Sequence, residues 1–309
     1  MIPLEIRNLN VDFRTLRGWV RVVDNVNLKI NSDDEILGLV GESGCGKSTL
    51  GLAVSGLLPP NSRVTGEVLV KGQDVVQNPD SRKIAVIFQD ALAALNPVLT
   101  IGEQIAEIYV YHKNMQKKDA LEKTKKVLVE VGLPDNTIDK YPHQLSGGQR
   151  QRVLIAMALA MEPDLIIADE PTTALDVTVQ AKVLQTLMSV VKSRKIPMIY
   201  ITHDLALASQ VADRIAVMYA GQIIEIADKY ELFENPRHPY TKALLNSVPR
   251  VDRDIEELFI IEGEPPVPGN FPTGCRFHPR CPFAMDKCKQ IEPGLVIFNK
   301  AMVRCFLYE

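Results

Sequence analysis

The spacing of apolar and polar residues changes along the chain and indicates which segments are strands and which are helices. Short runs rich in isoleucine and valine alternate with helix-length segments, at residues 35–40, 83–88, 165–168 and 198–201. Such runs are typical of parallel strands that helices cover on both faces. Residues 4–13 and 20–30 instead alternate apolar and polar side chains with no helix between them, the pattern of a half-solvated antiparallel hairpin. We therefore predict an α/β fold with a mixed sheet and an antiparallel N-terminal edge.

Two further regions depart from this alternation. Between residues 100 and 141 the strand pattern disappears, and lysine and glutamate residues accompany apolar residues at helical spacing. We predict a helical subdomain, at about residues 98–162, inserted in the α/β domain. After residue 235 the chain carries ten of its 20 prolines and four of its five cysteines. This change in composition predicts a boundary near residues 235–250, with an α/β domain at 1–250 and a small irregular extension at 251–309.

Composition and charge narrow the classes of function. The chain has 309 residues, 46% of them hydrophobic and 24% charged, which is ordinary for a globular protein. Its 35 lysines and arginines against 38 acidic residues give a net charge of -3, so no basic field predicts binding to nucleic acid. The most apolar stretch, residues 153–161, is much shorter than the roughly 20 residues of a membrane-spanning helix. Because the chain does not open with a basic segment and an apolar one, we expect a soluble, unsecreted protein, in which any membrane span belongs to other chains.

A phosphate-binding motif follows the first apolar run. Residues 41–48 read GESGCGKS, which fits the pattern G-x-x-x-x-G-K-[ST] between a strand and a helix-forming segment. The glycines let backbone N–H groups turn toward a β-phosphate at a helix N-terminus, where Lys47 adds a positive charge. The hydroxyl of Ser48 is a suitable ligand for Mg²⁺. This segment predicts a nucleoside triphosphate site.

Two acidic residues, Asp169 and Glu170, end the apolar run at 165–168. Adjacent side chains of a strand point to opposite faces, so we expect the two carboxylates to have different tasks. We predict that Asp169 holds Mg²⁺ and that Glu170 acts as the base toward the attacking water. Residues 145–149 read LSGGQ and precede a helical run, which makes them a second candidate anion site at a helix N-terminus. Two such sites mean either two anions or one nucleotide shared between two copies.

These motifs together resemble those of the ATP-binding cassette (ABC) ATPases. The matching segments are 41–48 for Walker A, 89 for the Q-loop, 145–149 for the signature, 165–169 for Walker B, 174–176 for the D-loop and 203 for the switch histidine. The resemblance implies a head-to-tail dimer in which Walker A of one chain and the signature of the other enclose one ATP. It also implies that Glu170 is catalytic, that Gln89 and His203 assist it, and that Ser48, Gln89 and Asp169 bind Mg²⁺.

The same resemblance implies a set of nucleotide-binding residues. They are Phe13, Ser43, Gly44, Cys45, Gly46, Lys47, Ser48, Thr49, Ser146, Gly147, Gly148 and Gln149. An aromatic side chain of the first hairpin stacks on adenine in this family. Phe13 is the expected residue, and Trp19 is the alternative because residues 14–19 resemble an insertion.

Two more segments resemble the ABC importers for oligopeptides, dipeptides and nickel. They are residues 88–104 and residues 236–245. The resemblance implies two transmembrane permease subunits, two ATPase subunits that are identical or paralogous, and an external substrate-binding protein. We expect this chain to be one ATPase subunit, peripheral at the cytoplasmic face of the cell membrane, that powers peptide import. Import of nickel or of an oligosaccharide is an alternative, because the ATPase does not touch the cargo, and a soluble cassette ATPase without a transporter is another.

The extension carries four cysteines, Cys275, Cys281, Cys288 and Cys305, and few large apolar residues. Small segments of this kind usually need disulfides or a metal, and disulfides rarely persist where a chain works on cytosolic ATP. The spacing C-x5-C-x6-C-x16-C lacks the close pairs of an ordinary zinc site. Residues 274–281 resemble a stretch that is associated with a [4Fe–4S] cluster in some members of the subgroup. We therefore expect such a cluster, with Zn²⁺ or with free or disulfide-bonded cysteines as the alternatives.

Overall fold

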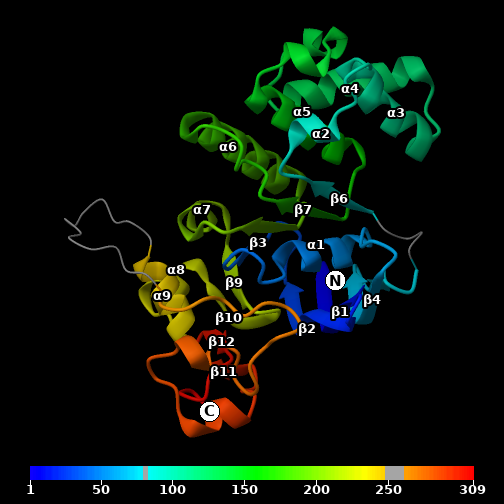
Figure 1. Ribbon diagram of the computed structural model, residues 1–309. Coiled ribbons are helices and arrows are strands. Elements are labelled where there is room, and N and C mark those ends of the chain that lie inside the picture. Colours follow the sequence, from blue (N-terminus) through cyan, green and yellow to red (C-terminus); the bar gives the residue numbers. More distant parts are fainter. Residues whose placement is uncertain (79–82, 248–260) are drawn as a thin grey trace. The chain divides into compact units, whose positions relative to one another are not determined.

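The structure is a computed structural model that describes residues 1–78, 83–247 and 261–309 (Figure 1). The described residues fall into two compact units. The first draws on residues 1–31, 36–80 and 200–309, and the second on residues 32–35 and 81–199. The predicted boundary between residues 250 and 251 lies outside the described residues.

The first unit contains an antiparallel sheet with the strand order β2-β1-β4-β5. Its strands are β1 (Leu4–Thr15), β2 (Gly18–Ile30), β4 (Ser62–Val70) and β5 (Gln73–Asp74). β1 and β2 form the predicted hairpin, in which Thr15 pairs with Gly18 across a tight turn. The predicted antiparallel N-terminal edge is therefore confirmed. β4 adds a strand that the apolar pattern did not indicate, because most of its side chains are exposed or half-buried.

The second sheet of this unit is mixed. It runs in the order β11-β12-β10-β9-β3, where β3 is parallel to β9 and the other pairs are antiparallel. The bounds are β3 (Ile36–Val40), β9 (Arg214–Tyr219), β10 (Gln222–Asp228), β11 (Val296–Phe298) and β12 (Ala301–Val303). Every residue of β3 is buried, as its continuous apolar run predicts. The helices of the unit are α1 (Lys47–Ser55), α7 (Leu205–Val211), α8 (Lys229–Glu234), α9 (Pro239–Asn246) and α10 (Asp286–Gln290), with a 3₁₀ turn η4 (His278–Arg280).

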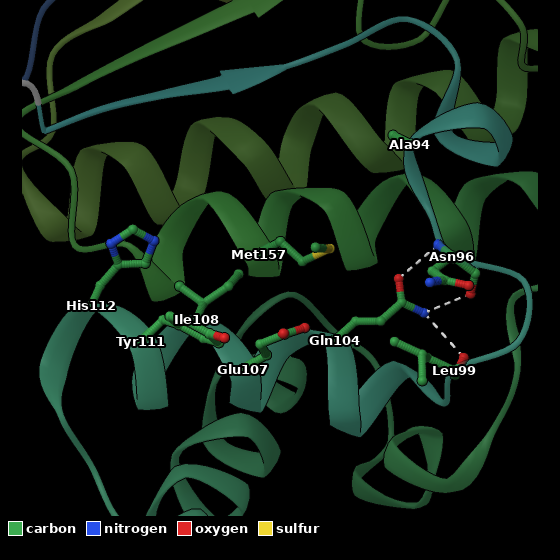
Figure 2. Close-up of a pocket in the computed structure, with 9 residues that line it drawn as sticks. All are labelled: Ala94, Asn96, Leu99, Gln104, Glu107, Ile108, Tyr111, His112 and Met157. Atoms are coloured by element: carbon green, nitrogen blue, oxygen red, sulfur yellow. Dashed lines mark hydrogen bonds between the residues drawn. The ribbon is translucent and has the colours of Figure 1, made fainter.

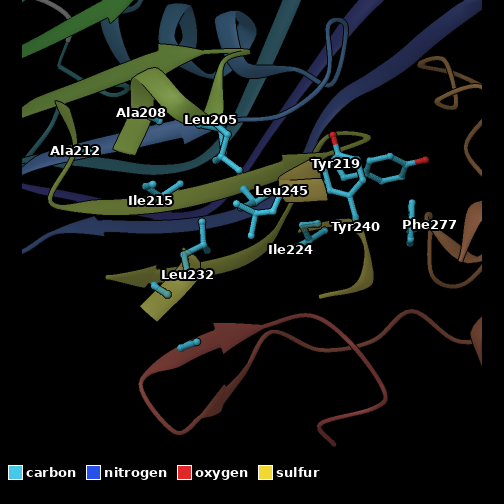
Figure 3. Close-up of a cluster of buried hydrophobic side chains, with 14 of the residues drawn as sticks. Leu205, Ala208, Ala212, Ile215, Tyr219, Ile224, Leu232, Tyr240, Leu245 and Phe277 are labelled. Carbon is cyan, nitrogen blue, oxygen red and sulfur yellow. The ribbon is translucent and has the colours of Figure 1, made fainter. Parts of the chain in front are cut away.

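An apolar core joins the C-terminal residues to this mixed sheet (Figure 3). Tyr219 at the end of β9 packs against Tyr240 of α9 with ring centroids 4.6 Å apart, and against Phe277 at 5.3 Å in an edge-to-face arrangement. Such aromatic pairs contribute about 0.5–1.5 kcal/mol beyond the area that they bury. β12 also pairs with β10, and Figure 1 shows β11 and β12, coloured red, beside β10. Residues 261–309 therefore pack as part of the first unit.

The second unit consists of two parallel strands and a group of helices. β6 (Ile84–Ile87) pairs with β7 (Leu165–Asp169). In β8 (Met198–Thr202) the chain passes from the second unit, which ends at residue 199, to the first, which resumes at residue 200. The helices are α2 (Ala91–Ala94), α3 (Ile101–Lys113), α4 (Lys117–Glu130), α5 (Gly147–Ala160) and α6 (Val177–Arg194), with 3₁₀ turns η2 (Asp135–Asp139) and η3 (Pro142–Gln144). The region predicted to be helical between residues 100 and 141 is helical. None of the helices in the described part of the chain combines the length and the apolar character that a membrane crossing requires.

Candidate functional site

The predicted phosphate-binding loop joins β3 to α1 in the first unit. Gly41 has a φ of 157°, and a Cβ at this position would lie 2.2 Å from the carbonyl oxygen of Met218. Gly46 is the N-cap of α1 and has a φ of 107°, in the left-handed region. The loop therefore ends at a helix N-terminus, where backbone N–H groups lack partners within the helix. Both glycines are required by the backbone, and this shape fits the predicted binding of phosphate.

Lys47 bends back over the loop. Its Nζ donates to the carbonyl oxygens of Gly41 at 2.8 Å and of Glu42 at 3.0 Å. Cys45 is buried, and burial raises the pKa of its thiol, so it serves as a small neutral packing residue. The side chains open to a ligand in this segment are those of Ser43 and Ser48, and Thr49 is half-buried.

Gln89, Asp169 and Glu170 lie at one edge of the parallel strand pair in the second unit. Ile87 of β6 is in register with Ala168 of β7, so the residues that follow these strands leave the sheet at the same edge. β7 ends at Asp169, and Glu170 has a φ of 46°. The strand therefore ends at Asp169, and the alternation that we expected for this pair does not extend to Glu170. The carboxylate of Glu170 accepts a hydrogen bond from the hydroxyl of Thr173 at 3.1 Å.

The LSGGQ segment is the N-terminus of α5, as predicted. Ser146 and Gln149 form a capping box, in which the Ser146 hydroxyl accepts the Gln149 N–H at 3.4 Å and the Gln149 side chain accepts the Ser146 N–H at 2.9 Å. A Cβ on Gly148 would lie 2.4 Å from Val179 of α6, and one on Gly147 would lie 3.0 Å from Leu175. The two glycines thus let α5 approach α6 and the D-loop closely.

The remaining predicted residues belong to the first unit. His203 follows β8, directly before Asp204, which caps the N-terminus of α7. Phe13 is half-buried in β1, and Trp19 of β2 is 48% exposed, with the guanidinium of Arg63 4.8 Å from its ring centroid. Residues 14–19 are the paired tip of the hairpin and not a separate loop. Which aromatic residue stacks on adenine stays a prediction.

A pocket of about 370 Å³ lies among the helices of the second unit (Figure 2). Its lining residues are Ala94, Asn96, Leu99, Gln104, Glu107, Ile108, Tyr111, His112 and Met157. The buried amide of Gln104 holds one side of it, because its oxygen accepts the N–H of Asn96 at 2.9 Å and its nitrogen donates to the carbonyl of Leu99 at 3.1 Å. Tyr111 is 76% exposed at the other end. The pocket is therefore a preformed recess with an exposed aromatic residue at its rim.

Comparisons with known proteins identify the family. The chain matches the ABC transporter family over residues 23–173 and the oligopeptide/dipeptide transporter C-terminal region over residues 224–288. It is 45% identical to the oligopeptide transport ATP-binding protein AppD of Bacillus subtilis, covering 99% of this chain and 97% of that protein. The dipeptide transport ATP-binding protein DppD of the same organism is 46% identical, covering 99% and 95%. The chain belongs to the ABC transporter family. The predicted family and subgroup are confirmed.

Solved structures of ABC proteins agree with this assignment. CbiO1 of Clostridium perfringens, part of an ABC transporter complex, has a TM-score of 0.65 at 27% identity, covering 76% of this chain and 91% of that chain. The ATP-binding cassette MJ0796, bound to ADP and phosphate in a dimeric post-hydrolysis state, has a TM-score of 0.62 at 28% identity, covering 73% and 98%. The predicted ABC fold is confirmed, and the chain is an ATP-hydrolysing subunit of the transport class.

The predicted [4Fe–4S] cluster is wrong. Cys275, Cys281, Cys288 and Cys305 do line one cavity, but its volume is about 10 Å³, roughly the space of one water molecule. No group of three or more histidine, cysteine, aspartate or glutamate side chains in the described residues could hold a metal ion. Burial raises the pKa of the Cys275 thiol to about 11 and also raises the pKa of the Cys281 and Cys305 thiols, whereas metal ligation needs thiolates. The same findings count against zinc, and the four cysteines are free thiols packed in the C-terminal segment, which is residues 261–309.

Contacts from α9 and from the C-terminal segment to the phosphate-binding loop could not be predicted from the sequence. Arg280 forms an ion pair with Glu42, and the hydroxyl of Tyr240 accepts the backbone N–H of Glu42 at 3.0 Å. The sequence pattern of residues 274–281 indicates a candidate role for their cysteines only. Nothing in the local pattern indicates that the arginine beside a cysteine reaches a glutamate 238 positions earlier.

Proposed function

We propose that this chain is the ATPase subunit of an importer for dipeptides or oligopeptides. The observation that carries the proposal is the match of residues 224–288 to the oligopeptide/dipeptide transporter C-terminal region, in addition to the ABC match. Relatives similar over nearly the whole chain are named as dipeptide or oligopeptide transport ATP-binding proteins. The chain thus resembles this subgroup in both of its regions.

In the proposed site, the loop between β3 and α1 binds the phosphates of ATP. The N–H groups at the start of α1 donate to phosphate oxygens, and Lys47 leaves its carbonyl partners to place its charge on the same oxygens. The signature at the start of α5 in a second copy or a paralogue, Ser146 to Gln149, binds the same ATP from the opposite side in a head-to-tail dimer. The close approach of α5 to α6 at Gly148 fixes the position of that helix N-terminus.

The residues proposed for Mg²⁺ are Ser48, Gln89 and Asp169. Their hydroxyl, amide and carboxylate oxygens are the hard donors that Mg²⁺ prefers, so the donor set fits this ion. Gln89 and Asp169 leave adjacent strands at the same edge, which supports a shared task. Bound Mg²⁺ supplies positive charge that offsets the charge of the phosphates.

Glu170 is the proposed general base, and His203 is the proposed contact to the γ-phosphate. The hydrogen bond from Thr173 orients the carboxylate of Glu170, which is proposed to accept a proton from the attacking water. Glu170 has a left-handed backbone directly after the last residue of β7. These two features support a positioned base at the strand end.

The pocket among the helices of the second unit is the proposed docking site for a permease. The occupant is a cytoplasmic loop of a transmembrane subunit, which places this chain as a peripheral subunit at the cytoplasmic face. An exposed Tyr111 beside a recess of about 370 Å³ offers an aromatic anchor to such a loop. Two permeases, a second ATPase subunit and an external binding protein complete the proposed importer.

The catalytic assignment is tested by Glu170→Gln in the purified chain. We expect ATP binding to persist and turnover to fall by about 10²–10⁴, the usual effect of losing a general base. Glu162→Gln is the matched control, since Glu162 also has a positive φ, of 50°, in the same unit, but pairs with Lys113 on the surface. Near-normal hydrolysis by Glu170→Gln would refute the assignment.

The cargo is tested by uptake in cells whose only copy of the chain is wild type, Glu170→Gln or Glu162→Gln. We expect Glu170→Gln to abolish uptake of a labelled dipeptide or oligopeptide and Glu162→Gln to preserve it. Loss confined to nickel or oligosaccharide uptake would replace the peptide assignment. If cells with Glu170→Gln take up peptide, nickel and oligosaccharide as wild type does, and no permease co-purifies with the chain from membranes, the result would favour a cassette ATPase without a transporter.

A further inference from the structure

The C-terminal segment holds the phosphate-binding loop at its second residue. The two terminal nitrogens of Arg280 donate to the two carboxylate oxygens of Glu42, at 2.8 Å and 3.1 Å, in a bidentate fork. The Arg280 side chain is 4% exposed and the Glu42 side chain 26%. Forked arginine–carboxylate pairs with a desolvated arginine are among the stronger and more directional ion pairs. This pair therefore fixes the position of the Glu42 side chain and places a positive charge beside its carboxylate.

Glu42 in turn contacts the residues that define the loop. Its carbonyl oxygen accepts a hydrogen bond from Nζ of Lys47 at 3.0 Å, and its N–H donates to the hydroxyl of Tyr240 at 3.0 Å. Two further hydrogen bonds fix Arg280. Its Nε donates to the carbonyl oxygen of Glu262 at 3.0 Å, and a terminal nitrogen donates to the hydroxyl of Tyr219 at 3.4 Å. Glu42 thus links the C-terminal segment to the lysine of the loop.

A second arginine of the same segment supports the other side of the loop. Arg276 donates to the backbone carbonyl of Ala220 and to the carboxylate of Asp24. The next residue, Gly221, donates its N–H to the carbonyl oxygen of Cys45 at 2.8 Å. The C-terminal segment therefore supports the loop at two positions, directly at Glu42 and through the Ala220–Gly221 peptide at Cys45.

We propose that Arg280 is a positioning residue for ATP binding, which neutralises Glu42 and holds the first turn of the phosphate-binding loop from the C-terminal segment. The inference rests on the proposed function, because it takes residues 41–48 as the site of the triphosphate. A bare carboxylate beside a triphosphate repels it, and a forked cation removes that repulsion. ATP affinity of this chain therefore depends on a side chain 238 positions away in the sequence.

The test is the dissociation constant of a fluorescent ATP analogue, measured by titration of the full-length chain. We expect Arg280→Met to weaken binding on the order of tenfold, and Arg280→Lys, which keeps the charge without the fork, to weaken it less. The defect of Arg280→Met should shrink as ionic strength rises, because salt screens the repulsion from an unpaired Glu42. In a Glu42→Gln background, the further change Arg280→Met should alter the dissociation constant by less than about twofold.

Arg304→Met is the matched control. Arg304 lies in the same segment with a side chain 8% exposed, and it pairs with Glu292 and with backbone carbonyls at Ile223 and Pro293. We expect it to lower the melting temperature as Arg280→Met does, but to change the dissociation constant by less than about twofold.

Three results would overturn the proposal. They are equal weakening by Arg280→Met and Arg304→Met, unchanged affinity in a folded Arg280→Met, and a full defect that persists in the Glu42→Gln background. Lys47→Ala separates this proposal from the proposed site. If Lys47→Ala binds the analogue as wild type does, the proposed triphosphate site is wrong. If Lys47→Ala does not bind it, the site is right and the Arg280 variants test the role of Arg280 alone.

Discussion

A buried histidine predicts how the stability of this protein depends on pH. His238 is the N-cap of α9, where its Nδ1 accepts the backbone N–H of Tyr240 at 3.0 Å, and only 1% of the residue is exposed. Burial lowers the pKa of His238 from 6.5 to about 3, and the nearby charge of Lys242 lowers this pKa further. The imidazole therefore stays neutral in the folded chain, and protonation would remove the acceptor that caps the helix.

The sign and the size of the effect follow from this difference in pKa. The unfolded chain takes up a proton near pH 6.5 and the folded chain does not, so the stabilisation is complete above pH 6.5 and is lost progressively as the pH falls toward 3. Since each pH unit below 6.5 costs about 1.4 kcal/mol, going from pH 7 to pH 5 should lower the free energy of unfolding by about 2 kcal/mol. For a chain of this size that corresponds to roughly 4 °C in melting temperature.

Glu225 also contributes to the pH dependence of stability, so the wild-type curve alone does not isolate His238. Glu225 accepts the backbone N–H of His238 at 2.9 Å, and burial raises the pKa of that carboxyl. The contribution of Glu225 to the pH dependence of stability therefore has the opposite sign. The folded state binds the proton of this carboxyl more readily than the unfolded state does, and it gains stability as the pH falls. A small cavity next to His238 is also lined by His278 and by four thiols, those of Cys275, Cys281, Cys288 and Cys305.

The variant His238→Asn isolates the histidine. Asparagine is a good N-cap and its side-chain oxygen can accept the Tyr240 N–H, while the backbone contact to Glu225 remains. Urea denaturation at pH 7 and pH 5 should give the variant about 2 kcal/mol less pH-dependent loss than wild type. Equal losses in the two proteins would refute the neutral, buried state of His238.

Three further substitutions probe packing in the two units, each by urea denaturation. Thr100→Ala removes the cap of α3 and should cost about 1 kcal/mol, whereas Thr100→Ser should restore most of it. Gly102→Ala would place a Cβ 2.2 Å from Cγ1 and 2.7 Å from the carbonyl oxygen of Ile138, so we expect a loss of about 1–3 kcal/mol, and a gain would contradict this packing. Phe277→Leu should cost about 1–3 kcal/mol because the ring contacts two buried tyrosines, while Phe283→Leu, 56% exposed in the same segment, should cost less than about 0.5 kcal/mol.

The parts of the candidate site that the sequence predicted are local ones. Residues 41–48 form a strand–loop–helix unit, and residues 145–149 begin a helix, because glycine conformation and helix capping are decided by a few neighbouring residues. The reason for Gly148 could not be predicted, since it is the closeness of Val179 on a helix that starts about thirty residues later. The spacing of the four cysteines led to the wrong prediction of a [4Fe–4S] cluster. Cysteines in a proline-rich segment can form a metal site only when their thiols can ionise and converge.

The α/β class, the antiparallel edge, the strand–loop–helix unit at residues 41–48 and the family could be predicted from the sequence, because each depends on a contiguous pattern of residues. Three features could be seen only in the tertiary structure: the C-terminal segment packs into the core of the first unit, burial raises the pKa of the Cys275 thiol, and Arg280 holds Glu42. These outcomes depend on contacts between residues far apart in the chain. Burial and pairing, which set the charge and the position of a side chain, arise only when such distant residues are brought together.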